Sequence, residues 1–204
     1  MSDRRAYDGG DDMSLDPRHV SACFITKEAV YPPAIVDRVM AVGFGECQFL
    51  TNCPSPHLKQ RLFEKAAHDY IYYQDDDCLA PIDALLTSAV PDRITCAMKP
   101  FHLQRYAHSR IALLGWGSII PKRLLSVLDC YREVYGEDHV FQRESERILT
   151  WFAWPQNRLE LPIEDLPSAW APDRLSMQPG HYDYIPLVEH RCSQLAGMLE
   201  EMLA

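Results

Sequence analysis

The feature that most constrains the fold of this chain is a regular alternation of strand-like and helix-like segments in its first third. β-Branched and aromatic runs alternate with amphipathic stretches, in the order strand 19–26, helix 33–42, strand 46–51, helix 56–67 and strand 70–73. Repeated β-α-β units of this size predict a parallel sheet with right-handed crossover connections. We therefore expect an α/β fold with a mostly parallel central sheet flanked by helices.

The rest of the chain departs from this alternation. Its pattern predicts, in order, a short helix at 80–90, short strands at 93–98 and 111–114, and helices at about 122–135, 144–152 and 188–204. Six of the fifteen prolines fall within 155–186, so this stretch is expected to be mostly irregular. We expect a disordered acidic tail over residues 1–17 and a single domain over residues 18–204.

The composition of the chain indicates which partners and which cellular compartment to expect. The net charge of −9 means that the overall field disfavours nucleic acid. A local basic strip remains open, because five cations lie close in sequence: Lys99, Arg105, Arg110, Lys122 and Arg123. We expect no transmembrane helix and no signal peptide, since the apolar runs are too short for either. The seven cysteines are scattered without a C-x-x-C pair, which predicts buried thiols in a reducing cytoplasm, that of the host if the protein is viral.

The strongest candidate for a functional site is the run Asp75, Asp76 and Asp77, which follows the predicted strand 70–73. Three like charges at a strand end are costly unless a cation or hydrogen-bond donors compensate them. In parallel sheets ligands bind at the carboxyl ends of the strands, where Thr26 and Asn52 are also expected. Carboxylate oxygens there suit a hard divalent ion that shares phosphate oxygens with a substrate. A solvated acidic loop is the alternative.

The order of strands and helices, with an Asp-rich turn after the third strand, resembles the nucleotide-sugar-binding half of GT-A fold glycosyltransferases over roughly residues 19–185. The family's D-x-D motif is matched by Asp75, Asp76 and Asp77. The resemblance implies metal-dependent transfer of a sugar from a nucleoside diphosphate sugar, first of all a UDP-sugar, to an acceptor hydroxyl. A Mn²⁺ or Mg²⁺ ion would stabilise the charge on the departing diphosphate. Asp75 would contact the ribose or uracil or the metal, Asp77 would bind the metal, and Asp76 would assist either one.

The same resemblance extends to other turns at the predicted strand ends. Thr26 and Lys27 match the family's polar turn under the nucleotide base, and Asn52 matches a position that often touches the base. In the glycine-containing turn that follows residue 114, Trp116 would stack on the sugar and Gly117 would let backbone amides approach the ligand.

The resemblance also suggests a catalytic base and a further metal ligand. A base must take the proton of the acceptor hydroxyl in an inverting displacement, and Glu146 is the first choice, with Glu144 second. The family more often has Asp at this helix start, and the helix dipole alone also favours acids there. His181, in a Pro-Gly-His-Tyr turn, is the candidate third protein ligand of the metal, with His190 as the alternative.

The sequence leaves other functions open. A non-catalytic nucleotide-binding module of the same fold is one alternative. A metal-dependent nuclease or phosphatase is favoured less, because such sites generally need further carboxylates or histidines. The chain also resembles in size the small glycosyltransferases with which some bacteriophages modify hydroxymethylated bases in DNA. Modified DNA, a glycan, a protein and a small molecule all remain open as acceptors, as do the donor sugar, the inverting or retaining course and the oligomeric state.

Overall fold

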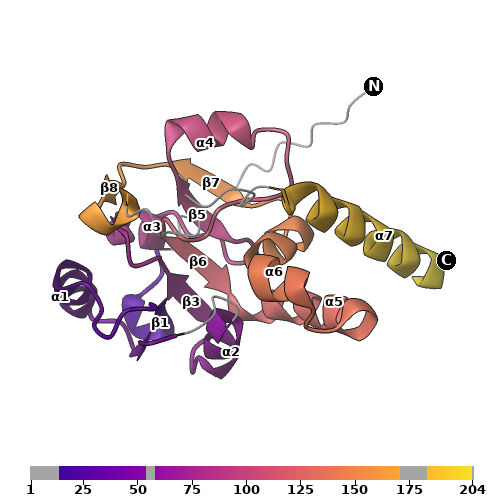
Figure 1. Ribbon diagram of the computed structural model, residues 1–204. Helices are drawn as coiled ribbons and strands as arrows, with labels where there is room; N and C mark the ends of the chain where they lie inside the picture. The colour runs from indigo at the N-terminus through magenta and orange to yellow at the C-terminus, as the bar shows by residue number, and fades with distance from the viewer. Residues whose placement is uncertain (1–13, 54–57, 171–182, 204) are drawn as a thin grey trace.

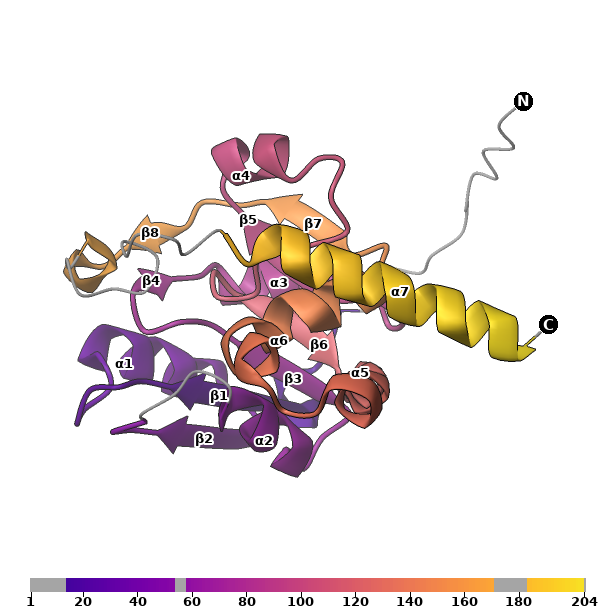
Figure 2. The same cartoon turned by 45° about the vertical axis from the view of Figure 1, so that its right-hand side comes forward.

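The structure is a computed structural model that describes residues 14–53, 58–170 and 183–203. Among these residues, six strands form a central sheet in the order β2-β1-β3-β6-β5-β7, and β4 pairs with β8 in a second, two-stranded sheet (Figures 1 and 2). The strands are β1 Val20–Ile25, β2 Glu46–Leu50, β3 Tyr70–Tyr73, β4 Cys78–Leu79, β5 Thr95–Met98, β6 Ser118–Pro121, β7 Asn157–Glu160 and β8 Glu164–Asp165.

Helices connect these strands and flank the sheet. The α-helices are α1 Pro33–Val42, α2 Leu58–Lys65, α3 Ile82–Thr87, α4 Pro100–Arg105, α5 Val127–Tyr135, α6 His139–Phe152 and α7 Ile185–Leu203. Short 3-10 helices are η1 Pro17–His19, η2 Lys122–Ser126 and η3 Pro167–Trp170. Within the described part of the chain, no helix combines the length and the apolar character needed to cross a membrane.

The central sheet is mostly parallel. Strand β1 runs parallel to both β2 and β3, and β7 runs parallel to β5. Strand β6 lies antiparallel to its neighbours β3 and β5, so it alone is reversed. The predicted α/β fold with a mostly parallel sheet flanked by helices is therefore confirmed.

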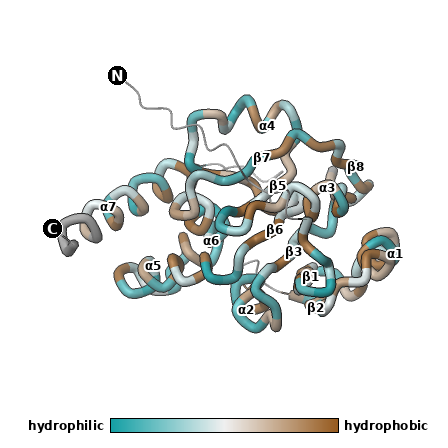
Figure 3. Tube along the Cα trace, turned by 180° about the vertical axis from the view of Figure 1, so that it is seen from behind, coloured by the Kyte–Doolittle hydropathy of each residue, from teal (hydrophilic) through white to brown (hydrophobic). Residues whose placement is uncertain are grey.

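Alternation along the strands divides the core between the two faces of the sheet. On β3, Ile71 and Tyr73 join one buried cluster, which Phe63 of α2 and residues of α5, α6 and α7 complete. Tyr72 points to the other face and joins a second cluster with residues of α1 and α3. Figure 3 shows hydrophilic and hydrophobic residues alternating along α5 and α7, as expected for helices that bury one side.

The first third of the chain follows the predicted pattern closely. Helix α1 and strand β3 have the predicted bounds, and β1, β2 and α2 lie within the predicted ranges. Helix α1 ends at Gly43, whose φ of 76° is left-handed and which therefore favours glycine. Residues 1–13 of the expected tail lie outside the described residues. Leu15, which the sequence places in that tail, packs against the second core cluster and donates its amide to the Leu86 carbonyl at 3.0 Å.

The prediction of a strand at 111–114 is wrong. Ile111 and Ala112 are buried, but side chains satisfy their backbone: Arg158 donates to the Ile111 carbonyl at 3.0 Å, and the Ala112 amide donates to Thr150 Oγ1 at 3.2 Å. The strand is instead β6, where the sequence predicted a turn leading into a helix. All four residues of β6 are buried, and the strand lies between β3 and β5. This burial explains why the segment is short and mostly apolar.

The proline-rich stretch 155–186 is less irregular than predicted. It contains β7, which extends the sheet at its edge, and β8, which pairs with β4 beside the aspartate run. Residues 171–182 of this stretch lie outside the described residues. Helix α4 was also not predicted, and the helix predicted at 122–135 begins as the 3-10 helix η2 before continuing as α5.

Arg158 fastens the loop after α4 to the edge strand β7. Its guanidinium donates to the carbonyls of Tyr106 at 2.7 Å, Ser109 at 2.8 Å and Ile111 at 3.0 Å. It also lies 5.1 Å from the centre of the Trp154 ring. One side chain therefore replaces the strand hydrogen bonds that this loop does not make.

We predict that Arg158→Met lowers the free energy of unfolding by about 2–4 kcal/mol, because several largely buried carbonyls lose their donor. Urea unfolding followed by circular dichroism measures the change. Arg93→Met is the matched control, since Arg93 is exposed just before β5, and it should change stability by less than about 0.5 kcal/mol. Equal stability of Arg158→Met and the parent would show that these hydrogen bonds contribute nothing net.

Candidate functional site

The candidate site lies at the carboxyl edge of the sheet. Strands β1, β3 and β5 all run in one direction, since β1 is parallel to β3 and β6 is antiparallel to both β3 and β5. The residues that follow these strands therefore meet at one edge: Thr26 after β1, Asp75 after β3 and Lys99 after β5.

Asp75 is packed against the backbone of the turn before β6. Its amide donates to the Gly115 carbonyl at 2.7 Å, and its carboxylate accepts a hydrogen bond from the Tyr73 hydroxyl. A Cβ on Gly115 would overlap this carboxylate and lie 2.6 Å from Asp75 Cγ. The absence of a side chain at Gly115 is therefore what gives the Asp75 carboxyl group its place, and the sequence analysis did not single this glycine out.

Asp76 is turned toward strand β1. Its carboxylate accepts a hydrogen bond from Thr26 Oγ1, and the residue is only 6% exposed. The structure thus brings together two of the predicted nucleotide-binding residues. The neighbouring Asp77 carbonyl accepts the Leu166 amide at 2.8 Å, so the segment around β8 holds the aspartate run in place.

Lys59 joins Asp75 to the candidate base. Lys59 comes from α2 and Glu146 from α6, and the Lys59 ammonium donates to the Glu146 carboxylate. The same ammonium lies 3.3 Å from the Tyr73 hydroxyl, which bonds Asp75. The sequence analysis missed Lys59, although its position three and four residues before Leu62 and Phe63 places a charge on the apolar face of the helix.

Burial raises the pKa of Asp75 to about 7. This value already includes the charges of Glu146 and Asp77, which also raise the pKa, and Lys59 and the Tyr73 hydroxyl, which lower it. Asp75 is therefore affected by the negative charges of both Asp77 and Glu146, and Lys59 is the cation that opposes them. An enclosed, partly compensated acidic group of this kind is stabilised by a proton or a cation.

Glu144 plays a different part from Glu146. Helix α6 begins at His139, where Asp138 caps it by accepting the amides of Val140 at 3.1 Å and Phe141 at 3.0 Å. The backbone of Glu144 is not helical, with φ of −124° and ψ of 17°, so α6 is kinked there and its second segment begins close to the predicted residue 144. Glu144 therefore lies at the kink, and Glu146 lies in the first turn of the helical segment that follows it.

The carboxylate of Glu144 is held by its own helix. The residue is 3% exposed, and Arg147 and Arg143 both form ion pairs with it. Burial raises the pKa of Glu144 and the two arginines oppose this. A carboxylate enclosed by two cations is a poor proton acceptor for a substrate, so the geometry favours Glu146 as the base.

The other predicted turn residues lie near the same edge but are used by the fold. Asn52 is exposed, has a left-handed backbone with φ of 53°, and donates its amide to the Glu28 carbonyl at 2.8 Å. Lys27 is exposed in the adjoining turn. Gly117 has φ of 102°, and a Cβ there would collide with Ala80 and lie 2.9 Å from Leu85 Cδ1, so its small size serves core packing.

Trp116 connects the aspartates to the end of β5. It follows Gly115 directly, its ring centre lies 4.2 Å from that of His102, and the Lys99 ammonium lies 5.2 Å from the ring centre. Lys99 in turn forms an ion pair with Asp165 of β8. An aromatic ring with Lys99 beside it thus follows the glycine that packs on Asp75, and stacking of Trp116 on a sugar stays a prediction.

The predicted third metal ligand, His181, lies outside the described residues, and the alternative, His190, is exposed on α7. In the ranges that the structure describes, no three Asp, Glu, His or Cys side chains are arranged to hold a metal ion. The described candidates for metal ligands are therefore Asp75 and Asp77, and any further ligands would have to be water, substrate or residues beyond these ranges.

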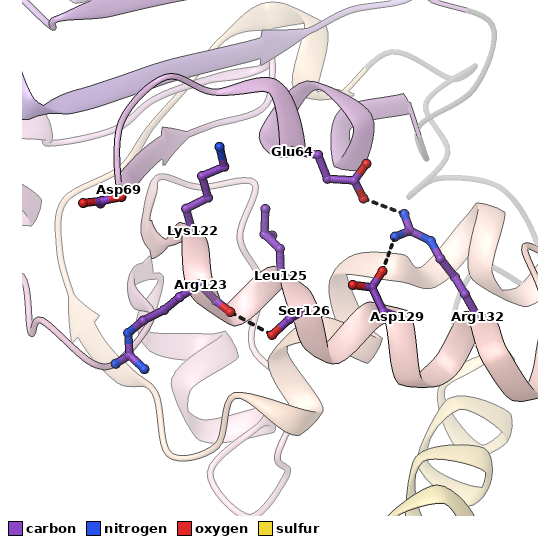
Figure 4. A pocket seen from close by; sticks show the side chains of 8 residues that line it. All are labelled: Glu64, Asp69, Lys122, Arg123, Leu125, Ser126, Asp129 and Arg132. Atoms are coloured by element: carbon purple, nitrogen blue, oxygen red, sulfur yellow. Dashed lines mark hydrogen bonds and ion pairs between the residues drawn. The ribbon is translucent and has the colours of Figure 1, made fainter.

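A cavity of about 540 Å³ lies at the opposite edge of the sheet (Figure 4). Its lining includes Asp69, which precedes β3, and Lys122, which follows β6. Its charges are paired: Arg132 bonds Glu64 at 2.8 Å and Asp129 at 3.0 Å. The other two cations of the lining are also engaged, since Lys122 donates to the Ala66 carbonyl at 2.6 Å and Arg123 pairs with Asp92. We therefore place the functional site at the aspartate edge and not in this cavity.

Comparisons with models of protein families, with curated proteins and with solved structures find no match to this chain. The likeness to GT-A glycosyltransferases therefore stays a prediction, and the site must be interpreted from its own geometry.

We predict that Gly115→Ala lowers the free energy of unfolding by about 1–3 kcal/mol, because the new methyl group must displace the Asp75 carboxylate. In an Asp75→Ala background the same change should cost less than about 1 kcal/mol, and urea unfolding of the four proteins gives the coupling energy. Gly197→Ala is the control, since nothing lies within 4 Å of its Cβ in helix α7, and alanine there should stabilise the helix. Additive changes at Gly115 and Asp75 would contradict the close packing.

The pH dependence of stability offers a second test. The pKa of Asp75 is raised in the folded state from 3.8 to about 7, so the folded protein binds the proton more tightly than the unfolded chain. The stabilisation that this proton provides is complete below pH 4 and is lost as the pH rises through 7. Relative to Asp75→Asn, the parent should therefore lose roughly 2–4 kcal/mol of unfolding free energy between pH 4 and pH 8, in EDTA. Parallel profiles of the two proteins would show that Asp75 titrates normally.

Proposed function

We propose that this protein is a metal-dependent glycosyltransferase with a GT-A-like fold, which moves a sugar from a nucleoside diphosphate sugar to an acceptor hydroxyl. The observation that carries the proposal is that Asp77 and Glu146 both act on the buried Asp75 at the carboxyl edge of β3, where Lys59 and Tyr73 connect Glu146 to Asp75. The first two come from the motif that resembles D-x-D, and the third comes from a helix more than sixty residues later in the chain. A donor site and a base must adjoin in this way for a sugar to pass between them.

The residues present suit a divalent metal ion. Burial and neighbouring acids make a negative charge on Asp75 costly, and a hard cation would relieve this cost. Asp75 and Asp77 would hold Mn²⁺ or Mg²⁺, and such ions commonly take only one or two carboxylates, with water and phosphate oxygens as their other ligands. The bound metal supplies electrostatic stabilisation of the departing diphosphate.

The chain's own residues would do the remaining work. Glu146 would accept the proton of the acceptor hydroxyl in an inverting displacement. Lys59, which holds Glu146 beside Tyr73, would orient that carboxylate. Thr26 and Asp76 form a buried hydrogen-bonded pair next to β1, where they would shape the nucleotide side of the site. A UDP-sugar as donor and a cytoplasmic setting are part of this proposal.

A non-catalytic nucleotide-binding module is the second candidate, and one observation favours it. The ion pair between Lys59 and Glu146 occupies the carboxylate that a base must use. If this pair persists when donor and acceptor bind, the site would hold nucleotide without transferring sugar. A nuclease or phosphatase gains no support, because the described residues bring no three metal-binding side chains together.

Two variants test the proposal against a panel of UDP-sugars and other nucleotide sugars with Mn²⁺. Asp77→Asn should abolish the metal dependence of donor binding, measured by calorimetry, because it removes a charge that holds a hard cation. Glu146→Gln should keep donor binding and lower transfer, or hydrolysis of the donor by water, roughly 10²–10⁴-fold. Glu133→Gln, an exposed change on α5, is the control and should match the parent.

The outcomes separate the candidates. Metal-dependent donor binding without any turnover in the parent would favour the non-catalytic module. If the parent neither binds nor hydrolyses any nucleotide sugar in the panel, the proposed function fails.

A further inference from the structure

Charge is unevenly distributed along this acidic chain. Residues 93–128 contain no Asp or Glu, although the whole protein has a net charge of −9. The same stretch carries six cations: Arg93, Lys99, Arg105, Arg110, Lys122 and Arg123. A long acid-free stretch in an acidic protein suggests a surface that meets an anion.

The structure divides this stretch between the two edges of the sheet. Lys122 and Arg123 follow the reversed strand β6 and line the cavity at the far edge, where Lys122 bonds the Ala66 carbonyl at 2.6 Å and Arg123 pairs with Asp92. Lys99 follows β5 directly and therefore lies at the edge that holds the aspartates, and Arg105 is the last residue of α4, the helix that begins there. Figures 1 and 2 show α4, which begins after Lys99, outside the edge strand β7.

Contacts link α4 directly to the candidate site. Gly115 covers the Asp75 carboxylate, and the next residue, Trp116, contacts His102 of α4. Lys99 pairs with Asp165, which lies opposite Cys78 in the β4–β8 ladder, next to Asp77. The surface of α4 is thus continuous with the edge at which the proposed sugar transfer would occur.

Aromatic rings continue from Trp116 along this surface. The ring centre of His102 lies 4.2 Å from that of Trp116 and 5.1 Å from that of Phe101. Phe101 is 64% exposed, so a large aromatic side chain is held in water beside Arg105, which is also exposed. Burial, with Arg105 and Lys99, lowers the pKa of His102 to about 4, so this ring is neutral at pH 7 and extends the aromatic row.

We propose that the α4 surface, formed by Lys99, Phe101, His102, Arg105 and Trp116, binds single-stranded nucleic acid, which makes a nucleic acid the acceptor if the proposed function holds. Exposed aromatic rings stack on bases, and the neighbouring cations attract phosphates. A neutral glycan would explain the rings but not the positive charges of Lys99 and Arg105 beside them. A membrane surface is disfavoured because α4 exposes a single large apolar side chain, whereas interfacial helices present a whole apolar face.

Fluorescence anisotropy with labelled dT₁₂ tests the surface in the absence of nucleotide sugar and metal. Phe101→Ala should weaken binding roughly 10-fold, within the range that loss of one stacked base produces. Arg105→Glu should weaken binding and reduce the salt dependence by about one phosphate contact. Met40→Ala, 61% exposed on α1, and Arg93→Glu, exposed at the opposite end of β5, are matched controls and should bind as the parent does. Circular dichroism verifies that all four variants are folded.

The proposal is overturned if the parent does not bind dT₁₂, if Phe101→Ala binds as tightly as the parent, or if the controls lose as much affinity as the test variants. Stronger binding to phosphatidylserine vesicles than to dT₁₂ would overturn it too. Because this assay needs no donor, its result is independent of the nucleotide-sugar panel. Binding of dT₁₂ that depends on α4, without any donor binding, would remove the proposed function and leave the α4 surface standing.

Discussion

The enclosed carboxyl group of Asp75 is the interaction on which the candidate site depends. Removing a carboxylate from water is costly, and the chain offsets this cost with the Tyr73 hydroxyl and the Lys59 ammonium. Gly115 provides the space, because any larger residue would meet the Asp75 side chain. A fold that serves only its own stability has little reason to enclose an acid whose pKa rises to about 7, so this cost points to function.

The groups that offset the negative charge of Asp75 also connect parts of the chain that are far apart in sequence. Lys59 on α2 reaches Glu146 on α6, so two of the helices that cover one face of the sheet meet near the end of β3. On the other side, the pair of Thr26 and Asp76 ties β1 to the aspartate run. The three consecutive aspartates therefore have three different environments: one faces the acidic cluster, one faces β1, and one adjoins β8 through its carbonyl.

The proposed function and the α4 surface rest on separate observations. The first depends on acids brought together at the end of β3, and the second depends on rings and cations that follow β5. Their common feature is the carboxyl edge of the sheet, where Trp116 lies between them. Strand β6 makes this arrangement: by running opposite to β3 and β5, it returns the chain from that edge and leaves its own cations at the other.

Local sequence was enough to predict the first three strands, the helices between them and the position of the aspartates. Each of these elements buries one face, so apolar residues recur in the sequence with a period of two residues in strands or 3.6 residues in helices. Local sequence also indicated Thr26, Asp75, Asp76 and Asp77, because polar residues at strand ends are visible as a pattern. Glu146 and Trp116 were indicated only by the resemblance to GT-A glycosyltransferases. The sequence did not show which of these residues contact one another.

Tertiary structure alone decided the pairing of Lys59 with Glu146, the role of Gly115 and the separation of Glu144 from the site. These depend on side chains from elements far apart in sequence, whose distances no local pattern contains. It also decided that 111–114 is a loop and that β6 is a central strand. Both segments are short and apolar, and only the partners available to their backbone hydrogen-bonding groups distinguish a buried strand from a buried loop: β3 and β5 for β6, and the side chains of Arg158 and Thr150 for the loop.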